Sequence, residues 1–110
     1  MDEKDSVLMV MCTAPDEGEA NRLAAALIER RLAACVNLLA PARSIYRWRG
    51  AIETATEIPM LIKTTAAAYP ALEAALRELH PYELPEILAL PAGGLPEYLA
   101  WVAAETGGAR

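Results

Sequence analysis

The sequence predicts an α+β domain in which an antiparallel sheet carries two helices on one face. Three observations lead to this prediction. Short apolar runs alternate with segments of helical period, in the order strand, helix, strand, hairpin, strand, helix, strand, helix. The chain of 110 residues has the length of one domain. Right-handed crossovers in this order give a split β-α-β sandwich of the ferredoxin-like type, a term for the topology that implies no iron.

The first strand, helix and strand lie at the start of the chain. Residues 6–13 are an apolar run that is too short for a buried helix, so we expect a strand. Asp16 and Glu19 have the spacing of a capping box and predict the start of a helix. Its predicted buried face consists of Ala20, Leu23, Ala24, Leu27 and Ile28. Residues 35–39 form the second predicted strand.

A change to period two predicts a hairpin after the second strand. Apolar and charged residues alternate over residues 44–49, and Gly50 permits a tight reversal into residues 51–53. Residues 57–65 then predict the third main strand. Pro59 is expected at its start or on a sheet edge, because proline donates no ladder hydrogen bond.

The C-terminal half is predicted to hold two helices and one strand. Thr64 or Thr65 can cap a helix that Pro81 stops. The apolar stripe of this helix consists of Tyr69, Leu72, Leu76 and Leu79. Residues 85–90 form the fourth predicted strand, and Pro96 opens a third helix. The apolar positions of the third helix are Leu95, Tyr98, Leu99, Trp101 and Val102.

Composition and charge exclude several classes of protein. The formal net charge of −5 has the wrong sign for a nucleic-acid groove, and no apolar run is long enough for a membrane span. Two cysteines and one histidine are too few for a zinc ribbon or a disulfide-rich scaffold, and the acidic N-terminus does not resemble a signal peptide. We therefore expect a cytoplasmic protein with a single domain over residues 1–110 and flexible tails at residues 1–5 and 106–110.

The composition of the strands predicts an oligomer. An antiparallel sheet with one solvated face should alternate apolar and polar residues, whereas residues 7–12, 60–62 and 87–90 are apolar throughout. The third helix is too short to cover a whole sheet face. A content of 55% hydrophobic residues therefore predicts that another copy of the chain covers most of that face, in an obligate homo-oligomer.

One group of side chains could hold a metal ion. Cys12 ends the first strand, His80 ends the second helix, and Glu86 begins the fourth strand, which this topology places beside the first. A thiolate, an imidazole and a carboxylate at one end of the sheet suit a late first-row divalent metal, with copper highest in the affinity order. The alternative is that these residues are a small buried hydrophobe, a cation at a helix C-terminus and a solvated carboxylate.

No catalytic constellation is apparent. The first strand-to-helix turn lacks the glycines of a phosphate loop, and no nucleophile has an obvious adjacent base, so we expect neither an enzyme nor an organic cofactor. Cys35 is expected in the core. It should not form a disulfide with Cys12, because the first two strands are not neighbours in this topology.

Several exposed side chains could line an interface or a cleft. Tyr46 and Trp48 alternate with Arg47 and Arg49, which gives the hairpin an aromatic side and a basic side. Base stacking is one interpretation, and subunit packing fits an acidic chain better. Lys63 could meet an anion or extend its ammonium group into solvent. Tyr98 and Trp101 lie one helical turn apart and predict the lid of a core or an interface.

Six motifs in order carry a resemblance to a known family. They are Cys12-Thr13-Ala14-Pro15, Leu32-Ala33-Ala34-Cys35-Val36-Asn37, Ser44-Ile45-Tyr46-Arg47-Trp48-Arg49-Gly50, Ile62-Lys63-Thr64-Thr65, His80-Pro81-Tyr82-Glu83-Leu84-Pro85-Glu86 and Tyr98-Leu99-Ala100-Trp101. From residue 7 to residue 105 the chain closely resembles CutA, the divalent-cation tolerance family. The resemblance implies a ferredoxin-like subunit, a tight homotrimer built by sheet edges and the hairpin, and a role in tolerance of copper and other divalent metals.

The resemblance also implies a ligand set. Cys12 and His80 match the copper ligands proposed for family members, with Glu86 as a further candidate. Leu79 stands where some members have a second histidine, so one imidazole is missing here. The site would lie in a cleft near a subunit boundary, lined by Tyr46, Trp48 and Trp101.

Two other classes of function stay open. One is a small-molecule sensor or signalling trimer, similar in architecture to the nitrogen-regulatory proteins, that binds an anion or metabolite at the intersubunit cleft through Lys63 and Arg47. The other is a structural trimer that binds a protein partner.

Overall fold

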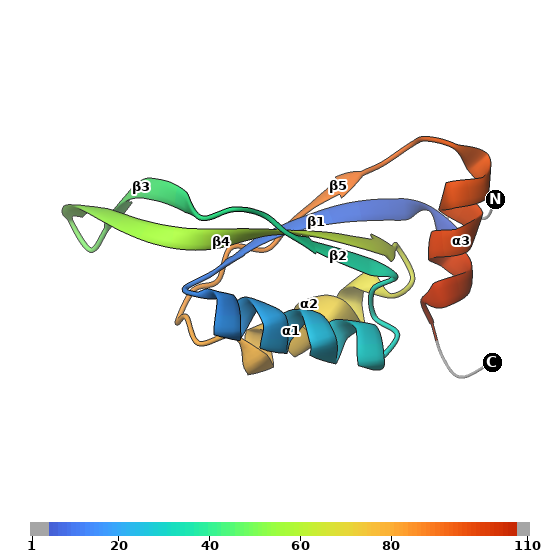
Figure 1. Cartoon of the computed structure of the whole chain (residues 1–110), viewed down its shortest axis with the longest axis horizontal. Helices are drawn as coiled ribbons and strands as arrows, with labels where there is room; N and C mark the ends of the chain where they lie inside the picture. Colours follow the sequence, from blue (N-terminus) through green and yellow to red (C-terminus); the bar gives the residue numbers. More distant parts are fainter. Residues whose placement is uncertain (1–4, 108–110) are drawn as a thin grey trace.

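The computed structural model describes residues 5–107, which form five strands and three helices (Figure 1). In chain order they are β1 (Val7–Ala14), α1 (Glu17–Glu29), β2 (Cys35–Leu38), β3 (Ala42–Trp48), β4 (Ala51–Thr65), α2 (Tyr69–Leu79), β5 (Leu88–Pro91) and α3 (Pro96–Glu105). No helix within residues 5–107 combines the length and hydropathy needed to cross a bilayer. The predicted order of elements is confirmed.

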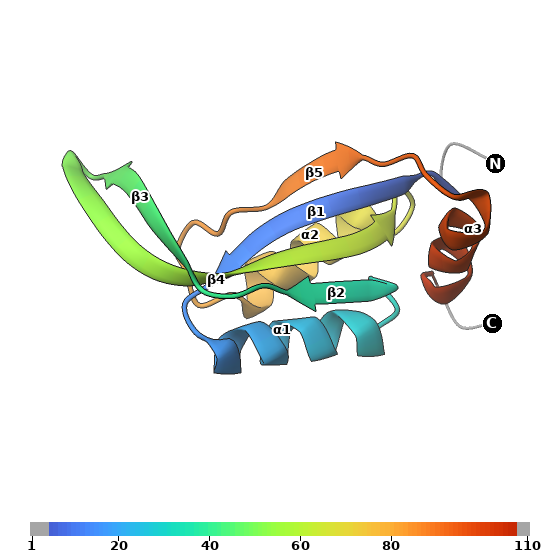
Figure 2. The same ribbon diagram turned by 45° about the horizontal axis from the view of Figure 1, so that its top comes forward.

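The sheet has the strand order β2-β4-β1-β5, and every neighbouring pair is antiparallel. β3 pairs with the outer half of β4 and forms the hairpin that extends beyond the main sheet (Figure 2). The first and last strands of the split β-α-β unit, β1 and β5, are neighbours, as the sequence predicted. The ferredoxin-like topology is therefore confirmed.

Both α1 and α2 cover one face of the sheet, and the core lies between them and the strands (Figure 1). Alternate residues of the central strands point toward the helices. The largest fully buried hydrophobic side chains of this layer are Val10, Cys12, Leu23, Leu27, Met60, Ile62, Leu72 and Leu76. α3 packs at one end of the sheet and leaves most of the other face uncovered (Figure 2).

The second arm of the hairpin and the third main strand are one continuous strand, β4, of 15 residues. Pro59 therefore lies inside a strand, and its predicted place at a start or edge is wrong. The carbonyl oxygen of Pro59 accepts a hydrogen bond from the Leu39 N–H at 2.9 Å. The nitrogen of Pro59 faces the same side as its carbonyl, toward the segment in which the chain passes from β2 to β3. The N–H that proline lacks would therefore not have bonded to β1, and the β1–β4 ladder loses no hydrogen bond.

The predicted helix signals are largely confirmed. The Asp16 carboxylate accepts a hydrogen bond from the Glu19 N–H at 2.8 Å and caps α1. Thr65, rather than Thr64, supports the start of α2, because its hydroxyl accepts the Ala68 N–H at 3.2 Å. The prediction that Ile28 faces the core is wrong, since this side chain is 43% exposed.

The C-terminal elements differ from prediction in their limits. β5 begins at Leu88, so Glu86 lies in the preceding loop and does not begin the strand. Pro96 is in the first turn of α3, as predicted. Thr106 is buried and the Gly107 N–H donates to the Arg31 carbonyl oxygen at 2.9 Å. The remainder of the predicted tails, residues 1–4 and 108–110, lies outside the described residues.

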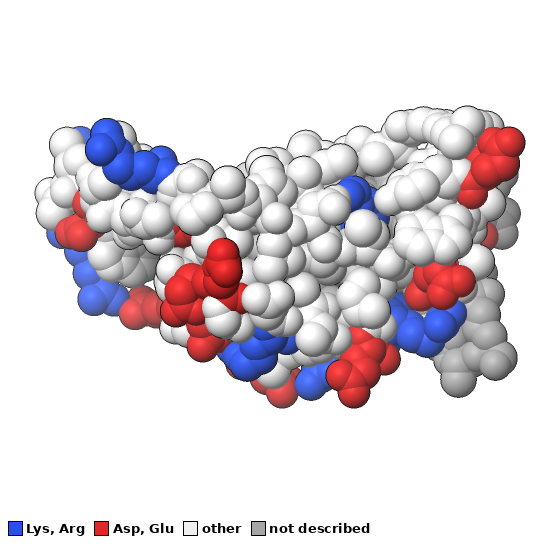
Figure 3. Space-filling view, viewed as in Figure 1, with Lys and Arg blue, Asp and Glu red and all other residues white. Residues whose placement is uncertain are grey.

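The face of the sheet opposite α1 and α2 is apolar and exposed in the single chain. By strand alternation and register it presents Met9, Met11, Leu61, Leu88 and Leu90. We call these five residues the open face. Leu88 and Leu90 are 55% and 49% exposed, and Figure 3 shows a wide, largely uncharged area over this side of the molecule, with one blue group within it. The sequence predicted that both sheet faces are buried. Within one chain, only the face that packs against α1 and α2 is buried.

Candidate functional site

Cys12, His80 and Glu86 belong to the same end of the sheet, as predicted. Cys12 lies near the end of β1, and His80 caps α2. The His80 Nε2 atom is 2.7 Å from the carbonyl oxygen of Thr13, which ties the end of α2 to β1. Glu86 lies in the loop that leads from α2 to β5 and is close enough to influence the Cys12 thiol electrostatically.

Both ring nitrogens of His80 are engaged in hydrogen bonds. Nδ1 accepts the Tyr82 N–H at 3.1 Å, so this nitrogen carries no proton in the observed arrangement. The Thr13 carbonyl can only accept, and Nε2 therefore donates to it. These two hydrogen bonds fix the direction of the chain after α2. A metal ion could bind either nitrogen only after one of these hydrogen bonds was broken.

The Cys12 thiol is buried and protonated at neutral pH. Cys12 is 1% exposed and lies in the layer between the sheet and the helices. Burial, and to a smaller extent the negative charge of Glu86, raises its pKa from 9.0 to about 12. The thiol points its weak donor toward the Thr13 carbonyl oxygen. A thiolate, which is the form that binds metals, is therefore disfavoured here.

The three side chains do not form a ready-made metal site. Within residues 5–107, no group of three or more His, Cys, Asp and Glu side chains is placed to hold a metal ion. Cys12 packs as a small core residue, His80 holds two backbone groups, and Glu86 is exposed to solvent. This arrangement matches the structural alternative for Cys12 and Glu86 that the sequence left open.

A buried carboxylate at the same end was missed by the sequence reasoning. Glu57 is 9% exposed, and its Oε2 atom accepts hydrogen bonds from the Tyr82 hydroxyl at 2.8 Å and the Thr13 hydroxyl at 3.2 Å. Burial, followed by the hydrogen bond to Glu57, raises the pKa of Tyr82. A glutamate directly before an apolar strand was the available signal, but its partners lie 25 and 44 residues away.

The hairpin contacts the loop of residues 80–87. Arg49 forms a two-oxygen ion pair with Glu83 at 2.8 and 2.9 Å, and its guanidinium lies 5.2 Å from the centre of the Trp48 ring. Tyr46 is near enough to Tyr82 for an electrostatic interaction. The register places Arg47 on the opposite side of the hairpin from Tyr46 and Trp48, as predicted. Arg49 lies in the turn with its guanidinium over the Trp48 ring, so its predicted place on the basic side is wrong.

Lys63, Tyr98 and Trp101 form a separate group at the other end of the sheet. Arg47 pairs with Ile52, which is eleven positions from Lys63 along β4, a separation of roughly 35 Å for extended chain. One small ligand cannot therefore bind Arg47 and Lys63 of the same chain. The predicted cleft lined by both hairpin aromatics and Trp101 is likewise not formed within one subunit.

Cys35 belongs to this second group and is not a core residue, so that prediction is wrong. It pairs with Lys63 across the sheet, on the side opposite the core, and is only half-buried. The Tyr98 hydroxyl lies near its thiol, and burial, followed by the Cys35 thiol, raises the pKa of Tyr98. The cysteines are both free, and β4 lies between their strands, which agrees with the predicted absence of a bridge.

The fold and these residues define a single-domain, ferredoxin-like α+β protein with a projecting hairpin and an uncovered apolar sheet face. The profile of the CutA1 divalent ion tolerance protein family matches residues 8–105. The chain belongs to this family.

Known proteins resemble the chain over nearly its whole length. A divalent-cation tolerance protein CutA from Pectobacterium atrosepticum is 49% identical over 86% of this chain and 87% of its own. CutA from the bacterium Xylella fastidiosa, known from a crystal structure, has 46% sequence identity to this chain. Its structure matches with a TM-score of 0.90 over 93% of this chain and 99% of that one. A periplasmic divalent cation tolerance protein CutA from Archaeoglobus fulgidus is 38% identical, with a TM-score of 0.87 over 90% and 97%.

Proposed function

We propose that this protein acts as a homotrimer in the tolerance of copper and other divalent cations. Membership of the divalent ion tolerance family supports the role. The open face supports the assembly, and it is the single observation on which the proposal depends. An apolar sheet face of this extent in contact with water is unfavourable, because each exposed Leu forfeits about 1.5–3 kcal/mol that burial provides.

The free edges of the sheet support the same assembly. β2 and β5 are the outer strands of the four-strand path, and each has a side that no strand of residues 5–107 pairs with. β5 is short and entirely exposed, with apolar side chains at Leu88 and Leu90. A further copy of the chain can pair with such an edge and cover the open face at the same time.

Substitution of the open face tests the assembly. We expect the double variant Leu88→Glu/Leu90→Glu to dissociate into monomers, because assembly would bury two carboxylates without partners. Ile28→Glu is the matched control, since Ile28 is similarly exposed but lies on the helix layer. Native mass spectrometry of both variants distinguishes the outcomes. Equal oligomeric states for the two variants would contradict the proposed interface.

We propose further that the protein binds copper or another divalent cation, with Cys12, His80 and Glu86 as the candidate ligands. In the single chain this requires that Cys12 lose its proton and that His80 release a backbone group. The affinity should therefore rise about tenfold per pH unit well below the thiol pKa, because one proton is released on binding.

Calorimetric titration with Cu(II), and with Zn(II) as a redox-inert ion, tests this site. The wild type is compared with Cys12→Ser/His80→Ala and with Cys35→Ser, which removes the thiol on the opposite face. We expect the double variant alone to lose affinity. Equal affinities, or an affinity independent of pH, would reject these ligands and leave the proposed assembly unaffected.

We also propose that the protein is cytoplasmic and has no catalytic activity. The free thiols are in keeping with a reducing compartment. Fractionation of cells that express the full-length protein tests the location.

A further inference from the structure

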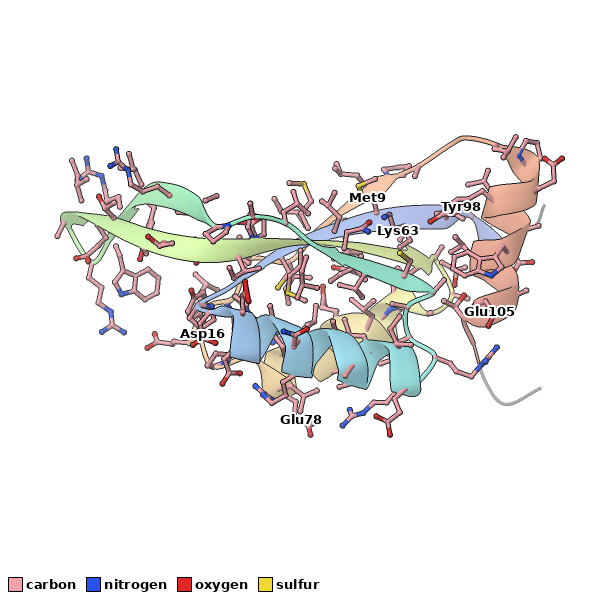
Figure 4. All side chains as sticks on the ribbon, viewed as in Figure 1. Met9, Asp16, Lys63, Glu78, Tyr98 and Glu105 are labelled. Atoms are coloured by element: carbon pink, nitrogen blue, oxygen red, sulfur yellow. The ribbon has the colours of Figure 1, made fainter. Side chains whose placement is uncertain are left out.

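Lys63 stands apart from the other charged residues of the chain. It is the only lysine in residues 5–107, and it lies on the side of β4 that faces away from the helices. Its neighbours across the sheet are Met9 on β1 and Cys35 on β2. Figure 4 shows Lys63 beside Met9 on the open face, with Tyr98 close by. The lysine is already half-buried in the single chain.

No carboxylate among residues 5–107 neutralises Lys63. Its ammonium group donates to the Asn37 Oδ1 atom, which is neutral. The ion pairs of this part of the chain join Arg22 to Glu19 and Arg49 to Glu83, and neither includes Lys63. The positive charge of Lys63 therefore has no negatively charged partner within residues 5–107.

The groups around Lys63 are mainly hydrogen-bond donors. An ammonium group has three N–H bonds, and Asn37 takes one of them. The Asn37 amide oxygen accepts this hydrogen bond, and no described contact uses the Asn37 NH2 group. The Tyr98 hydroxyl reaches the adjacent Cys35 thiol. The site thus offers several hydrogen-bond donors around one positive charge and few hydrogen-bond acceptors.

Coverage of the open face by another copy would remove the water that solvates Lys63. A buried ammonium group without a counter-charge is strongly unfavourable, whereas the same group paired with an anion and hydrogen-bonded is tolerated. We infer that the assembled protein binds a small oxyanion, a carboxylate or phosphate group, at Lys63 with Asn37 and Tyr98 as neighbouring donors; this inference rests on the proposed oligomer. A covered site of this kind excludes polymeric anions, in agreement with the net charge of −5.

Thermal unfolding of the full-length protein tests the inference. Melting is measured with sodium phosphate, succinate or citrate, each from 0.1 to about 20 mM, against sodium chloride of equal ionic strength. The variants are Lys63→Met, which keeps the apolar stem, and Arg77→Met, which removes a positive charge from the outer side of α2. Comparison of the variants separates binding from the general stabilisation that excluded anions give every protein.

We expect a saturable rise of about 3 °C or more for the wild type and for Arg77→Met with at least one oxyanion, and none beyond the chloride control for Lys63→Met. Whether phosphate or the carboxylates give the rise identifies the source of the anionic group. Equal rises in all three proteins would overturn the inference.

Sedimentation of the same samples separates this inference from the proposed assembly. An oligomer whose melting does not depend on oxyanions overturns the anion site alone, and indicates that a carboxylate of a neighbouring copy balances Lys63. A monomeric wild type overturns both proposals. An oligomeric Lys63→Met variant that lacks the oxyanion response supports both.

Discussion

The burial of Cys12 predicts a specific loss of stability at alkaline pH. The folded state holds the thiol pKa at about 12, above the ordinary value of 9.0. A raised pKa means that the folded chain keeps the proton more tightly than the unfolded chain does. The stabilisation is therefore complete below pH 9 and is lost as the pH rises toward 12. Each pH unit within this window costs about 1.4 kcal/mol, which amounts to roughly 3 kcal/mol at pH 11 as an upper value.

Urea unfolding of the wild type and Cys12→Ala at pH 8 and pH 10.5 measures this effect. At pH 8 we expect the variant to be less stable by about 1–2 kcal/mol, because a buried atom is removed from the core. At pH 10.5 the gap should narrow or reverse, since the variant has no thiol to ionise. Both proteins contain the same tyrosines, so the comparison cancels the contribution of tyrosine ionisation to the pH dependence, including that of Tyr82, whose pKa is also raised. Cys35→Ala is the control. A gap that is the same at both pH values would refute the buried, protonated state of Cys12.

Three further predictions concern the hydrogen bonds of the fold and are read out by urea unfolding at pH 7. Tyr82→Phe should cost about 1.5–3 kcal/mol, because buried Glu57 loses its shorter hydrogen bond, and an unchanged stability would contradict the network. Asp16→Ala should lower the free energy of unfolding by about 1 kcal/mol, because the α1 cap is lost, while Asp16→Asn should keep most of the capping stabilisation. Arg49→Ala should change stability by less than about 1 kcal/mol, since its ion pair with Glu83 is exposed, and a larger loss would indicate that the hairpin is held by this contact.

The order of elements could be predicted because local signals agree with the tertiary structure. Helical periodicity and a cap at Asp16 define α1, and Gly50 with a φ of +82° permits the turn between β3 and β4. The limits of the strands were less predictable. Pro59 indicated an edge, but its position depends on where the chain leaves β2 for β3, which no local pattern records.

The site was predictable in its location and not in its chemistry. Topology alone brings Cys12 and His80 to one end of the sheet. Their protonation depends on burial and on backbone partners, which residue types do not reveal. Glu57 was missed because its partners Thr13 and Tyr82 come from distant segments. Cys35 was misplaced because an apolar run does not show which of its residues face the helices.

The open face connects the fold to the proposed function. Met11, Leu88 and Leu90 extend the apolar surface of the sheet where the single chain offers no cover. Assembly over this face would also bury Lys63, so the trimer and the inferred oxyanion site depend on the same contact surface.

Sedimentation velocity of the wild-type protein at micromolar concentration tests the central claim most directly. A homotrimer predicts a single species with about three times the chain mass of 11.8 kDa. Dilution over about two orders of magnitude should leave this species unchanged, because an obligate assembly buries the open face. A stable, folded monomer of 11.8 kDa would contradict the claim that a second copy covers the sheet.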